Sequence, residues 1–315
     1  MSGDIEIKRY TPALSTSWND FVAASTNGTF LHDRRFMEYH SDRFDDHSLI
    51  FESDGKIIAC LPANRVRDTL QSHGGLTFGG LLIKPSTSAA QVVEIFDSLR
   101  DDLVRQGIGA LHYKPVPHIF HTQPAEADIY ALFNAGARQV RTDLSAAIPL
   151  HRKLSFSSGR KYGAKKAAKA GLTTAETTDF AAFWDILAEV LDQRHDARPT
   201  HSLDEITRLN AAFPKRIRLF ASFEDERMLA GVVLFDFGRS VHCQYMASSG
   251  DGRDLGALDL VVQSLVNDTF ADRDWFSFGI STTAEGRELN VGLSRQKEMF
   301  GARSLAIPQY KWDLA

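Results

Sequence analysis

Histidines at three places in this chain are candidates for proton transfer. His118 and His121 lie in a proline-bounded loop after a strand-like segment, with Glu126 shortly downstream. His201 lies just before a capping-box pattern that predicts the N-terminus of a helix. Because imidazole titrates near neutral pH, each could act as a general base. We favour His118 or His121, because one of two imidazoles beside a carboxylate can be oriented while the other accepts the proton.

The loop histidines also have other possible uses. A loop imidazole can simply be satisfied by water or backbone, and at least one of the pair is expected to bind substrate without moving a proton. A metal site with His112 is disfavoured, because His112 and Tyr113 point to opposite faces of a strand. We therefore expect no metal.

The segment from His151 to Gly171 is strongly basic and has no acidic residue. Read as a helix, it places Lys161, Lys165 and Lys169 on one stripe. Such a stripe could hold phosphates, with Arg160, Lys161 and Lys165 as the expected cofactor-binding residues. A solvated linker helix is an equally good interpretation. Few aromatic residues interrupt the segment, which favours a diphosphate over a nucleic acid.

Glycines punctuate a loop, Ser248–Ala257, that follows a predicted strand and opens a helix. Free backbone amides in such a loop can point at an anion, assisted by the helix dipole. The expected cofactor-binding residues here are Gly250, Gly252, Arg253 and Gly256. The spacing is a poor dinucleotide fingerprint, and the following strand ends in Gly-Ile-Ser without an acidic ribose ligand.

Polar residues also follow a later predicted strand. Ser281, Arg287 and Asn290 come after Trp275–Gly279, and Arg287 and Asn290 at i, i+3 would share one helix face. The alternative is a first helical turn capped by Ser281 or Thr282, with a solvated arginine. Earlier, Gln244 and Tyr245 alternate along a mostly apolar strand, so one should face the core and the other, preferably Gln244, a ligand.

The elements that position these residues occur twice. In residues 48–150 and again in 218–315, a strand, a turn and further strands lead to an amphipathic helix, a strand, a helix and a final strand. The helices expected before the two site loops are Val92–Gln106 and Leu258–Ala271, and Leu76–Ile83 is expected to be a buried strand. Two similar mixed α/β units are therefore predicted, with a ligand cleft between them.

Composition narrows the class of protein without naming a reaction. The 315 residues are 43% hydrophobic and carry a net charge of −4, which fits a soluble globular protein without a global attraction to nucleic acid. Cys60 and Cys243 are expected to be small buried hydrophobes, and the low cysteine content favours a reducing cytoplasm. The N-terminus lacks a signal-peptide pattern and no run of about 18 apolar residues occurs, so we expect neither secretion nor a membrane span.

The repeated order of elements resembles the GNAT acyltransferase fold. Two such units in one chain resemble the Fem-type aminoacyl transferases of cell-wall synthesis and related acyltransferases found with polysaccharide genes. The stretches that carry the resemblance are Gly28–His32, Tyr113–His121, Pro199–Ser202, His242–Tyr245 and Phe278–Ser281 with Gly286, Arg287 and Asn290. It implies two tandem GNAT-like domains from an internal duplication, at 1–150 and 173–315, joined by a basic linker helix at 151–172.

The resemblance also implies an activity. It predicts a cytoplasmic N-acyltransferase that moves an acyl group from acyl-coenzyme A to an amino group of a nucleotide- or lipid-linked amino sugar in cell-surface polysaccharide synthesis. The expected substrate-binding residues are His32, Tyr113, Lys114, Glu126, Gln244, Tyr245, Ser281, Arg287 and Asn290.

Two alternatives stay open at this point. The sequence Arg253-Asp-Leu-Gly-Ala-Leu258 departs from the GNAT phosphate loop, which leaves aminoacyl-tRNA as a possible donor to a peptidoglycan precursor. The absence of the long helical hairpin of some Fem-type enzymes favours coenzyme A. A non-catalytic binding protein of the same fold is the remaining alternative.

Overall fold

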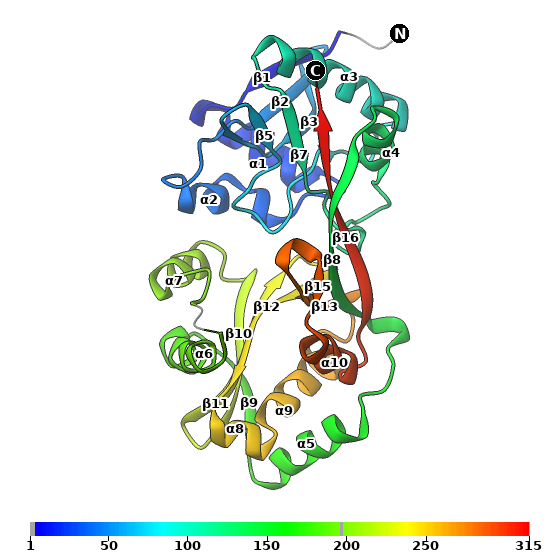
Figure 1. The fold of residues 1–315 in the computed structure, drawn as a ribbon. Helices are drawn as coiled ribbons and strands as arrows, with labels where there is room; N and C mark the ends of the chain where they lie inside the picture. The colour runs from blue at the N-terminus through cyan, green and yellow to red at the C-terminus, as the bar shows by residue number, and fades with distance from the viewer. Residues whose placement is uncertain (1–3, 196–197, 315) are drawn as a thin grey trace. The chain divides into compact units, whose positions relative to one another are not determined.

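The computed structural model describes residues 4–195 and 198–314, which divide into two compact units (Figure 1). Unit 1 holds residues up to Asp143, Glu285–Arg287 and those from Ala306 on. Unit 2 holds Leu144–Ala284 and Glu288–Leu305. These bounds differ from the expected domains, because the long strands β8 (Arg138–Pro149) and β16 (Arg303–Asp313) each contribute residues to both units.

The described part of unit 1 combines short strands with α-helices. Its strands are β1 (Glu6–Arg9), β2 (Leu49–Ser53), β3 (Lys56–Leu61), β4 (Asn64–Val66), β5 (Thr69–Gln71), β6 (Leu82–Ile83) and β7 (Ala110–Tyr113). Its helices are α1 (Ser15–Ala24), α2 (Arg34–Met37), α3 (Ala89–Arg105) and α4 (Ala127–Asn134). One sheet has the order β1-β2-β3-β6, and the neighbouring strands β4-β5-β7-β16 belong to a second sheet. The β2–β3 turn places Asp54 and Gly55 at positive φ, as a tight hairpin requires.

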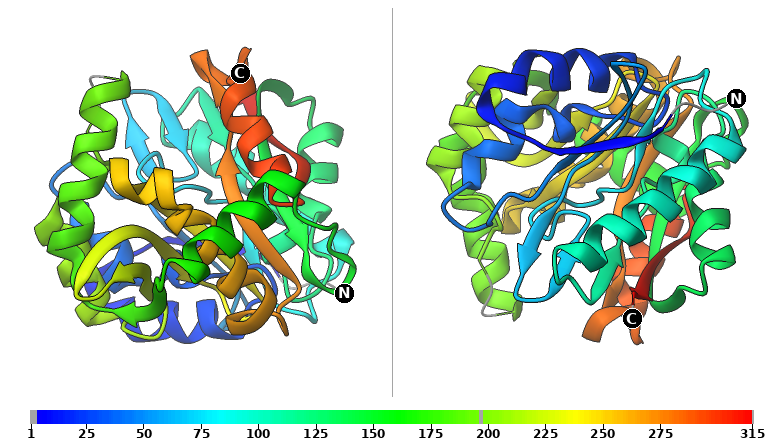
Figure 2. Two further views of the ribbon diagram at one scale, coloured as in Figure 1. Left: turned by 90° about the horizontal axis from the view of Figure 1, so that it is seen from below. Right: turned by 90° about the horizontal axis from the view of Figure 1, so that it is seen from above.

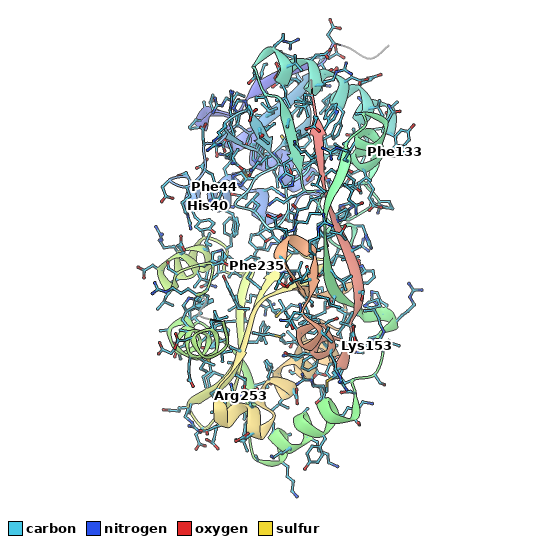
Figure 3. The ribbon with its side chains drawn as sticks, viewed as in Figure 1. His40, Phe44, Phe133, Lys153, Phe235 and Arg253 are labelled. Carbon is cyan, nitrogen blue, oxygen red and sulfur yellow. The ribbon has the colours of Figure 1, made fainter. Side chains whose placement is uncertain are left out.

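The core of unit 1 lies between α3 and the strands. A capping box at Ser88 and Gln91 starts this helix, and its apolar stripe, including Phe96 and Leu99, is fully buried. Separately, the rings of His40 and Phe44 pack together with centroids 4.8 Å apart (Figure 3). In contrast, Phe133 on α4 is 77% exposed.

Unit 2 is built on one larger sheet. Its further strands are β9 (Thr173–Thr177), β10 (Ile217–Glu224), β11 (Arg227–Asp236), β12 (Ser240–Ser248) and β13 (Trp275–Ile280), with a small hairpin of β14 (Thr282–Thr283) and β15 (Glu288–Leu289). Its α-helices are α5 (Ser158–Lys169), α6 (Phe180–His195), α7 (Leu203–Ala212), α8 (Gly250–Leu255), α9 (Ala257–Ser264) and α10 (Val291–Met299). The strand order in this unit is β8-β13-β12-β11-β10-β9. Neighbouring strands are antiparallel except β12 and β13, which are parallel.

The repeated order of elements predicted from the sequence is confirmed. Apart from the inserted β4 and β5 in the first half and α8, β14 and β15 in the second, the series β2, β3, β6, α3, β7, α4, β8 returns as β10, β11, β12, α9, β13, α10, β16. In unit 2, α5 and α9 lie side by side (Figures 1 and 2), and the backbones of Gly163 and Gly256 come into contact where the two helices meet. The basic segment is therefore a helix packed on unit 2.

Two expected elements are shorter than predicted. Only Leu82–Ile83 of the segment 76–83 pairs as a strand, because the preceding backbone folds against its neighbours: a Cβ on Gly79 would lie 1.9 Å from the Ser72 carbonyl oxygen. The close backbone approach that its glycines predict is thus correct, although the strand is not. Helix α9 ends at Ser264 and continues as a π-helical turn over Leu265–Thr269.

Candidate active site

The central strands of unit 2 diverge. The parallel pairing of β12 with β13 covers only Ser240 to His242, opposite Trp275 to Ser277. On its other side, β12 pairs Cys243 with Leu234 and Tyr245 with Val233, which leaves Gln244 as the extra residue of a β-bulge. Beyond His242, β12 has no strand partner on the β13 side within the described chain. Those backbone amides and carbonyls along this edge that bond no other group of the protein are therefore available to a ligand.

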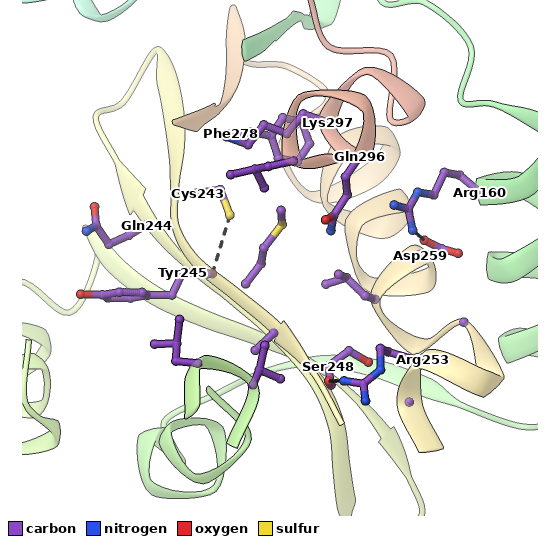
Figure 4. A pocket seen from close by; sticks show the side chains of 18 of the residues that line it. Arg160, Cys243, Gln244, Tyr245, Ser248, Arg253, Asp259, Phe278, Gln296 and Lys297 are labelled. Atoms are coloured by element: carbon purple, nitrogen blue, oxygen red, sulfur yellow. Dashed lines mark hydrogen bonds and ion pairs between the residues drawn. The ribbon is translucent and has the colours of Figure 1, made fainter. Parts of the chain in front are cut away.

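A pocket of about 540 Å³ opens where the two strands separate (Figure 4). Side chains from β12, β13, α5, α8, α9 and α10 line it, including Arg160, Cys243, Gln244, Tyr245, Met246, Ser248, Arg253, Asp259, Phe278, Gln296 and Lys297. Cys243, Phe278 and Lys297 gather at one end, and Ser248 and Arg253 lie at the other (Figure 4). The volume falls in the range of about 300–1,000 Å³ that small-molecule sites occupy.

Lys297 is a buried cation without a carboxylate partner in the described chain. Its Nζ donates to the carbonyl oxygens of Gly279 at 2.9 Å and Ile280 at 2.5 Å, and to Ser281 Oγ at 2.9 Å. Burial lowers the pKa of Lys297 to about 8. At this point β13 is no longer paired with β12. The ammonium therefore bonds strand carbonyls that would otherwise lack a hydrogen-bond partner.

Cys243 is a buried thiol, as the sequence predicts for both cysteines. Burial raises the pKa of Cys243 to about 12, so the sulfur is not a thiolate at neutral pH. Its Sγ contacts the Tyr245 carbonyl oxygen at 3.6 Å. The thiol therefore contributes shape to the pocket and is unsuited to nucleophilic attack.

An ion pair crosses the start of α9. Arg160 Nη1 on α5 lies 2.6 Å from Asp259 Oδ1, and both side chains are largely buried. Close packing brings α5 to this point, because a Cβ on Gly163 would meet the Asp259 carboxylate and a Cβ on Gly256 would meet the Gly163 carbonyl. A carboxylate and a second helix thus occupy the first turn of α9, where a phosphate would otherwise be favoured.

The expected open glycine loop before α9 is a short helix. Ser249 caps α8, and its Oγ accepts the Gly252 amide at 3.1 Å, while the Gly256 amide donates to the Gly252 carbonyl. The amides of Gly252, Arg253 and Gly256, expected to face an anion, are therefore already bonded. Gly252, Arg253 and Gly256 line the pocket, and Gly250 does not. Donor binding by these four residues stays a prediction.

Gln244 and Tyr245 do not alternate, because the bulge turns both side chains to the side of β12 away from the Cys243 sulfur (Figure 4). Both residues nevertheless line the pocket. The Tyr245 hydroxyl lies 2.6 Å from His201 Nδ1 and accepts the His201 backbone amide at 3.2 Å. Trp184 Nε1 also donates to the His201 carbonyl. These hydrogen bonds fix His201 between α6 and α7.

The loop histidines lie in unit 1. His118 is exposed at the start of a 3-10 turn, His118–Phe120. His121 Nε2 donates to the Val116 carbonyl at 2.9 Å, which leaves the lone pair on Nδ1, a buried atom without a hydrogen-bond partner. Burial lowers the pKa of His121. His121 is therefore a neutral imidazole of fixed tautomer. Glu126, the residue before α4, is exposed.

Three other predicted substrate-binding residues of unit 1 are largely buried. His32 Nδ1 accepts the Thr29 amide at 3.0 Å, and burial lowers the pKa of His32 to about 4. The Tyr113 hydroxyl donates to Asp128 Oδ2 at 2.6 Å. Lys114 Nζ donates to the Leu76 carbonyl at 2.6 Å, and burial lowers its pKa to about 8.

Ser281, Arg287 and Asn290 are not arranged as expected, although substrate binding by them stays a prediction. Arg287 is exposed, belongs to unit 1 and lies outside any helix, so it cannot share a helix face with Asn290. Asn290 is itself the N-cap of α10, with Oδ1 accepting the Leu293 amide at 2.9 Å. Ser281 instead receives the Lys297 ammonium, so neither it nor Thr282 caps this helix.

The basic residues of α5 separate into two groups. Arg160 lines the pocket, where Asp259 neutralises it, whereas Lys161 and Lys165 are exposed and do not line it. The expected phosphate stripe therefore does not act as one surface toward this pocket.

Sequence reasoning missed Lys297 and Asp259. Each interrupts the apolar stripe of its helix: Lys297 lies between Leu293 and Phe300 at helical spacing, and Asp259 lies in the run Ala257–Val262. A charge at a core position predicts a buried partner or a site. That signal was present in the sequence.

Among the described residues, no group of three or more His, Cys, Asp or Glu side chains is arranged to hold a metal ion. No α-helix in that part of the chain is both long and apolar enough to cross a bilayer.

One stretch of the chain matches a known protein family. Residues 156–286, which contribute most of the pocket, match the family model of the acetyltransferase (GNAT) domain. No curated protein sequence matches the chain.

Solved structures share the fold across both units. FemX superposes with a TM-score of 0.69 at 12% identity over 98% of this chain and 97% of FemX. L-PGS from Bacillus licheniformis gives 0.61 at 12% identity over 96% and 91% of the two chains. A tandem GNAT protein from the clavulanic acid biosynthesis pathway gives 0.51 at 10% identity over 99% of each chain. Residues 156–286 therefore resemble a GNAT acetyltransferase domain, and the chain has the fold of FemX and of the tandem GNAT protein.

Proposed function

We propose that this protein is an N-acyltransferase that moves an acyl group from acyl-coenzyme A to an amino group of a nucleotide- or lipid-linked amino sugar. The observation that carries the proposal is the pocket between the diverging strands β12 and β13, in a domain that matches the GNAT model. The donor is treated as a substrate that enters this pocket with its acyl end toward Cys243 and Phe278.

The free edge of β12 suits an extended, amide-containing donor arm. An edge strand offers alternating N–H donors and C=O acceptors, which an extended chain with amides can pair as a further strand would. The apolar side chains of Met246 and Phe278 provide contact area beside it. A backbone N–H on the same edge can polarise the carbonyl of a bound acyl group.

The reaction needs little more than this positioning. The acceptor amine, once neutral, attacks the thioester carbonyl, a C–N bond forms, and the C–S bond of the tetrahedral intermediate breaks to release the thiol. One proton leaves the attacking nitrogen and one reaches the departing sulfur. For the proton acceptor we retain His118 or His121, with His201 as the third possibility; the fixed tautomer of His121 supports its inclusion.

The start of α9 supports keeping aminoacyl-tRNA as the alternative donor, with a peptidoglycan precursor as acceptor. Coenzyme A donors carry a diphosphate, and the Asp259 carboxylate with the packed α5 disfavours an anion at this helix terminus. An aminoacyl ester would use the same pocket for its acyl end and would place its phosphates elsewhere.

The test is a thiol-release assay with acetyl- and longer acyl-coenzyme A and a panel of amino-sugar nucleotides. A parallel assay uses aminoacyl-tRNA with a peptidoglycan precursor. The diagnostic variant is Arg253→Ala, which removes a cation that lines the pocket and donates to the Ser248 carbonyl at 3.0 Å. Its matched control is Arg227→Ala, which removes an exposed arginine outside the pocket.

We expect Arg253→Ala to raise the donor KM by roughly tenfold, as the loss of one charge-assisted contact would. Arg227→Ala should leave the donor KM within about twofold. Turnover only with aminoacyl-tRNA would replace the first donor by the alternative. Saturable donor binding without turnover on any amine would instead favour a non-catalytic binding protein.

A further inference from the structure

A second, smaller groove lies in unit 2 beside α5. It has a volume of about 210 Å³ and shares no lining residue with the pocket between β12 and β13. Its polar lining consists of Lys153, Ser155, Lys161, Gln263 and Asn267. We call it the α5 groove. No carboxylate is among the side chains that line it.

The two lysines of the α5 groove keep most of their hydrogen-bonding capacity. Lys153 Nζ donates to the Val266 carbonyl at 3.2 Å, which fixes the ammonium at the groove and leaves two of its three hydrogens. Lys161 forms no ion pair or hydrogen bond through its Nζ in the described chain. Both cations are therefore available to an anion.

The far wall of the groove adds neutral donors. Gln263 and Asn267 lie about one helical turn apart, across the junction of α9 with the π-helical turn Leu265–Thr269. Neither side-chain amide has a hydrogen-bond partner in the described chain. A π-turn displaces the residues that follow it, and such turns are frequent at functional sites. Here the turn also contains Val266, which anchors Lys153.

The charge around the groove reinforces this arrangement. Asp268, which follows Asn267 in the chain, is exposed and does not line the groove. Further along α5, Lys165 and Lys169 are exposed, and neither is in an ion pair in the described chain. Two ammonium groups, two amides and a hydroxyl are the donors that a tetrahedral oxyanion requires.

We propose that the α5 groove binds a phosphate group carried by a larger molecule. Lys153 and Lys161 supply the charge, and Ser155, Gln263 and Asn267 supply neutral donors. The apolar side chain of Leu154, which lines the groove and is 45% exposed, gives the group that bears the phosphate a surface to pack on. This site does not depend on the proposed transferase activity, because none of its residues belongs to the acyl pocket.

The test is a titration of the full chain with inorganic phosphate, monitored by NMR chemical shifts. Chloride keeps the ionic strength constant. Constant ionic strength matters because exposed charges are screened by salt. The variants are Lys161→Ala and Gln263→Leu, and the matched control is Lys169→Ala, which removes the same charge from the same helix outside the groove. Sedimentation with phosphatidic acid vesicles, compared with phosphatidylcholine vesicles, distinguishes a lipid headgroup from a soluble phosphate.

We expect saturable phosphate binding with shifts at Lys161, Gln263 and Asn267. Lys161→Ala should weaken it by roughly tenfold, as the loss of one charge-assisted hydrogen bond predicts, and Lys161→Arg should restore it. Vesicle binding that is lost in the same variants would assign the phosphate to a lipid, and phosphate binding alone would assign it to a soluble molecule. Absence of saturable binding, or equal weakening by Lys169→Ala, would overturn the proposal.

Discussion

The ammonium of Lys297 donates to the Gly279 carbonyl oxygen at 2.9 Å, at the point where β13 has separated from β12. Gly279 has a φ of +73°, a conformation that favours glycine, so the strand turns where the lysine meets it. A side chain of α10 thus replaces strand pairing on one wall of the proposed acyl pocket. Lys297 is a positioning residue for this wall.

The first prediction concerns the pH dependence of stability at Lys297. Burial lowers its folded pKa to about 8, below the unfolded value of about 10.4, so the unfolded state binds more protons between these values. Its contribution to stability is therefore fully present above about pH 10.4 and is lost as the pH falls through 8. The free energy of unfolding of wild type relative to Lys297→Met should rise by about 1–3 kcal/mol from pH 8 to pH 10.

Urea denaturation across this pH range measures the effect. Lys114 also has a pKa lowered to about 8, but it is present in both proteins and cancels in the difference. A difference curve that stays flat would mean that Lys297 titrates as an exposed lysine does.

The second prediction concerns the buried pair in unit 1. Burial raises the pKa of Asp128 to about 6, and the Tyr113 hydroxyl donates to its Oδ2 at 2.6 Å. A folded pKa above the unfolded value of about 3.9 means that the stabilising contribution is present below pH 3.9 and is lost as the pH rises through 6. Wild type should therefore lose stability relative to Asp128→Asn between pH 4 and pH 6, as measured by thermal or urea unfolding.

Tyr113→Phe provides the matched test of the pair. It should destabilise unit 1 by about 1–3 kcal/mol, because it removes the hydroxyl that donates to a buried carboxylate and accepts the Leu81 amide. A cost near zero would show that water replaces the hydroxyl.

The third prediction concerns the contact between α5 and α9. Arg160→Ala leaves the Asp259 carboxylate largely buried without its partner and should cost about 1–3 kcal/mol. The double variant Arg160→Ala/Asp259→Ala should cost less than the sum of the two single changes. As a control, Arg227→Ala removes two exposed pairs, with Glu224 and with Asp251, and should change the unfolding free energy much less than Arg160→Ala does. Strict additivity would contradict a direct interaction.

Local signals in the sequence predict local structure well here. The capping box of Ser202 and Glu205 is confirmed at the start of α7, because both bonds are made within one turn. The basic helix α5 and the repeated order of elements are confirmed for the same reason, since helical and strand periodicity is a short-range property.

The misses arise where tertiary contacts compete with local signals. Ser281 is a good N-cap by type, yet its hydroxyl is taken by Lys297, and Asn290 caps the helix instead. The glycines after Ser249 predict an open loop, but a Cβ on Gly252 would lie 2.3 Å from the Leu229 carbonyl oxygen, so close packing explains that glycine. Similarly, side chains alternate along a regular strand, but the bulge at Gln244 places the side chains of Gln244 and Tyr245 on the same side.

The fourth prediction identifies the general base by turnover. Removing the true base should lower kcat by roughly 10²–10⁴-fold with little change in donor KM. We expect this effect for His118→Ala or His121→Ala. Surface-exposed His151, whose Nε2 lies 3.2 Å from Asp274 Oδ1, provides the control His151→Ala with unchanged turnover. His201→Ala should act mainly on stability, because His201 bonds the Tyr245 hydroxyl.

A pH profile separates a base from a structural histidine. Because burial lowers the pKa of His121, a rate that depends on neutral His121 should be half-maximal at a pH below the usual imidazole pKa of about 6.5 and should level off at higher pH. Loss of that acidic limb in His121→Ala, together with the fall in kcat, would assign the base to His121. If all three single variants kept near-normal turnover, the amine would lose its proton to solvent and catalysis would rest on positioning in the pocket between β12 and β13.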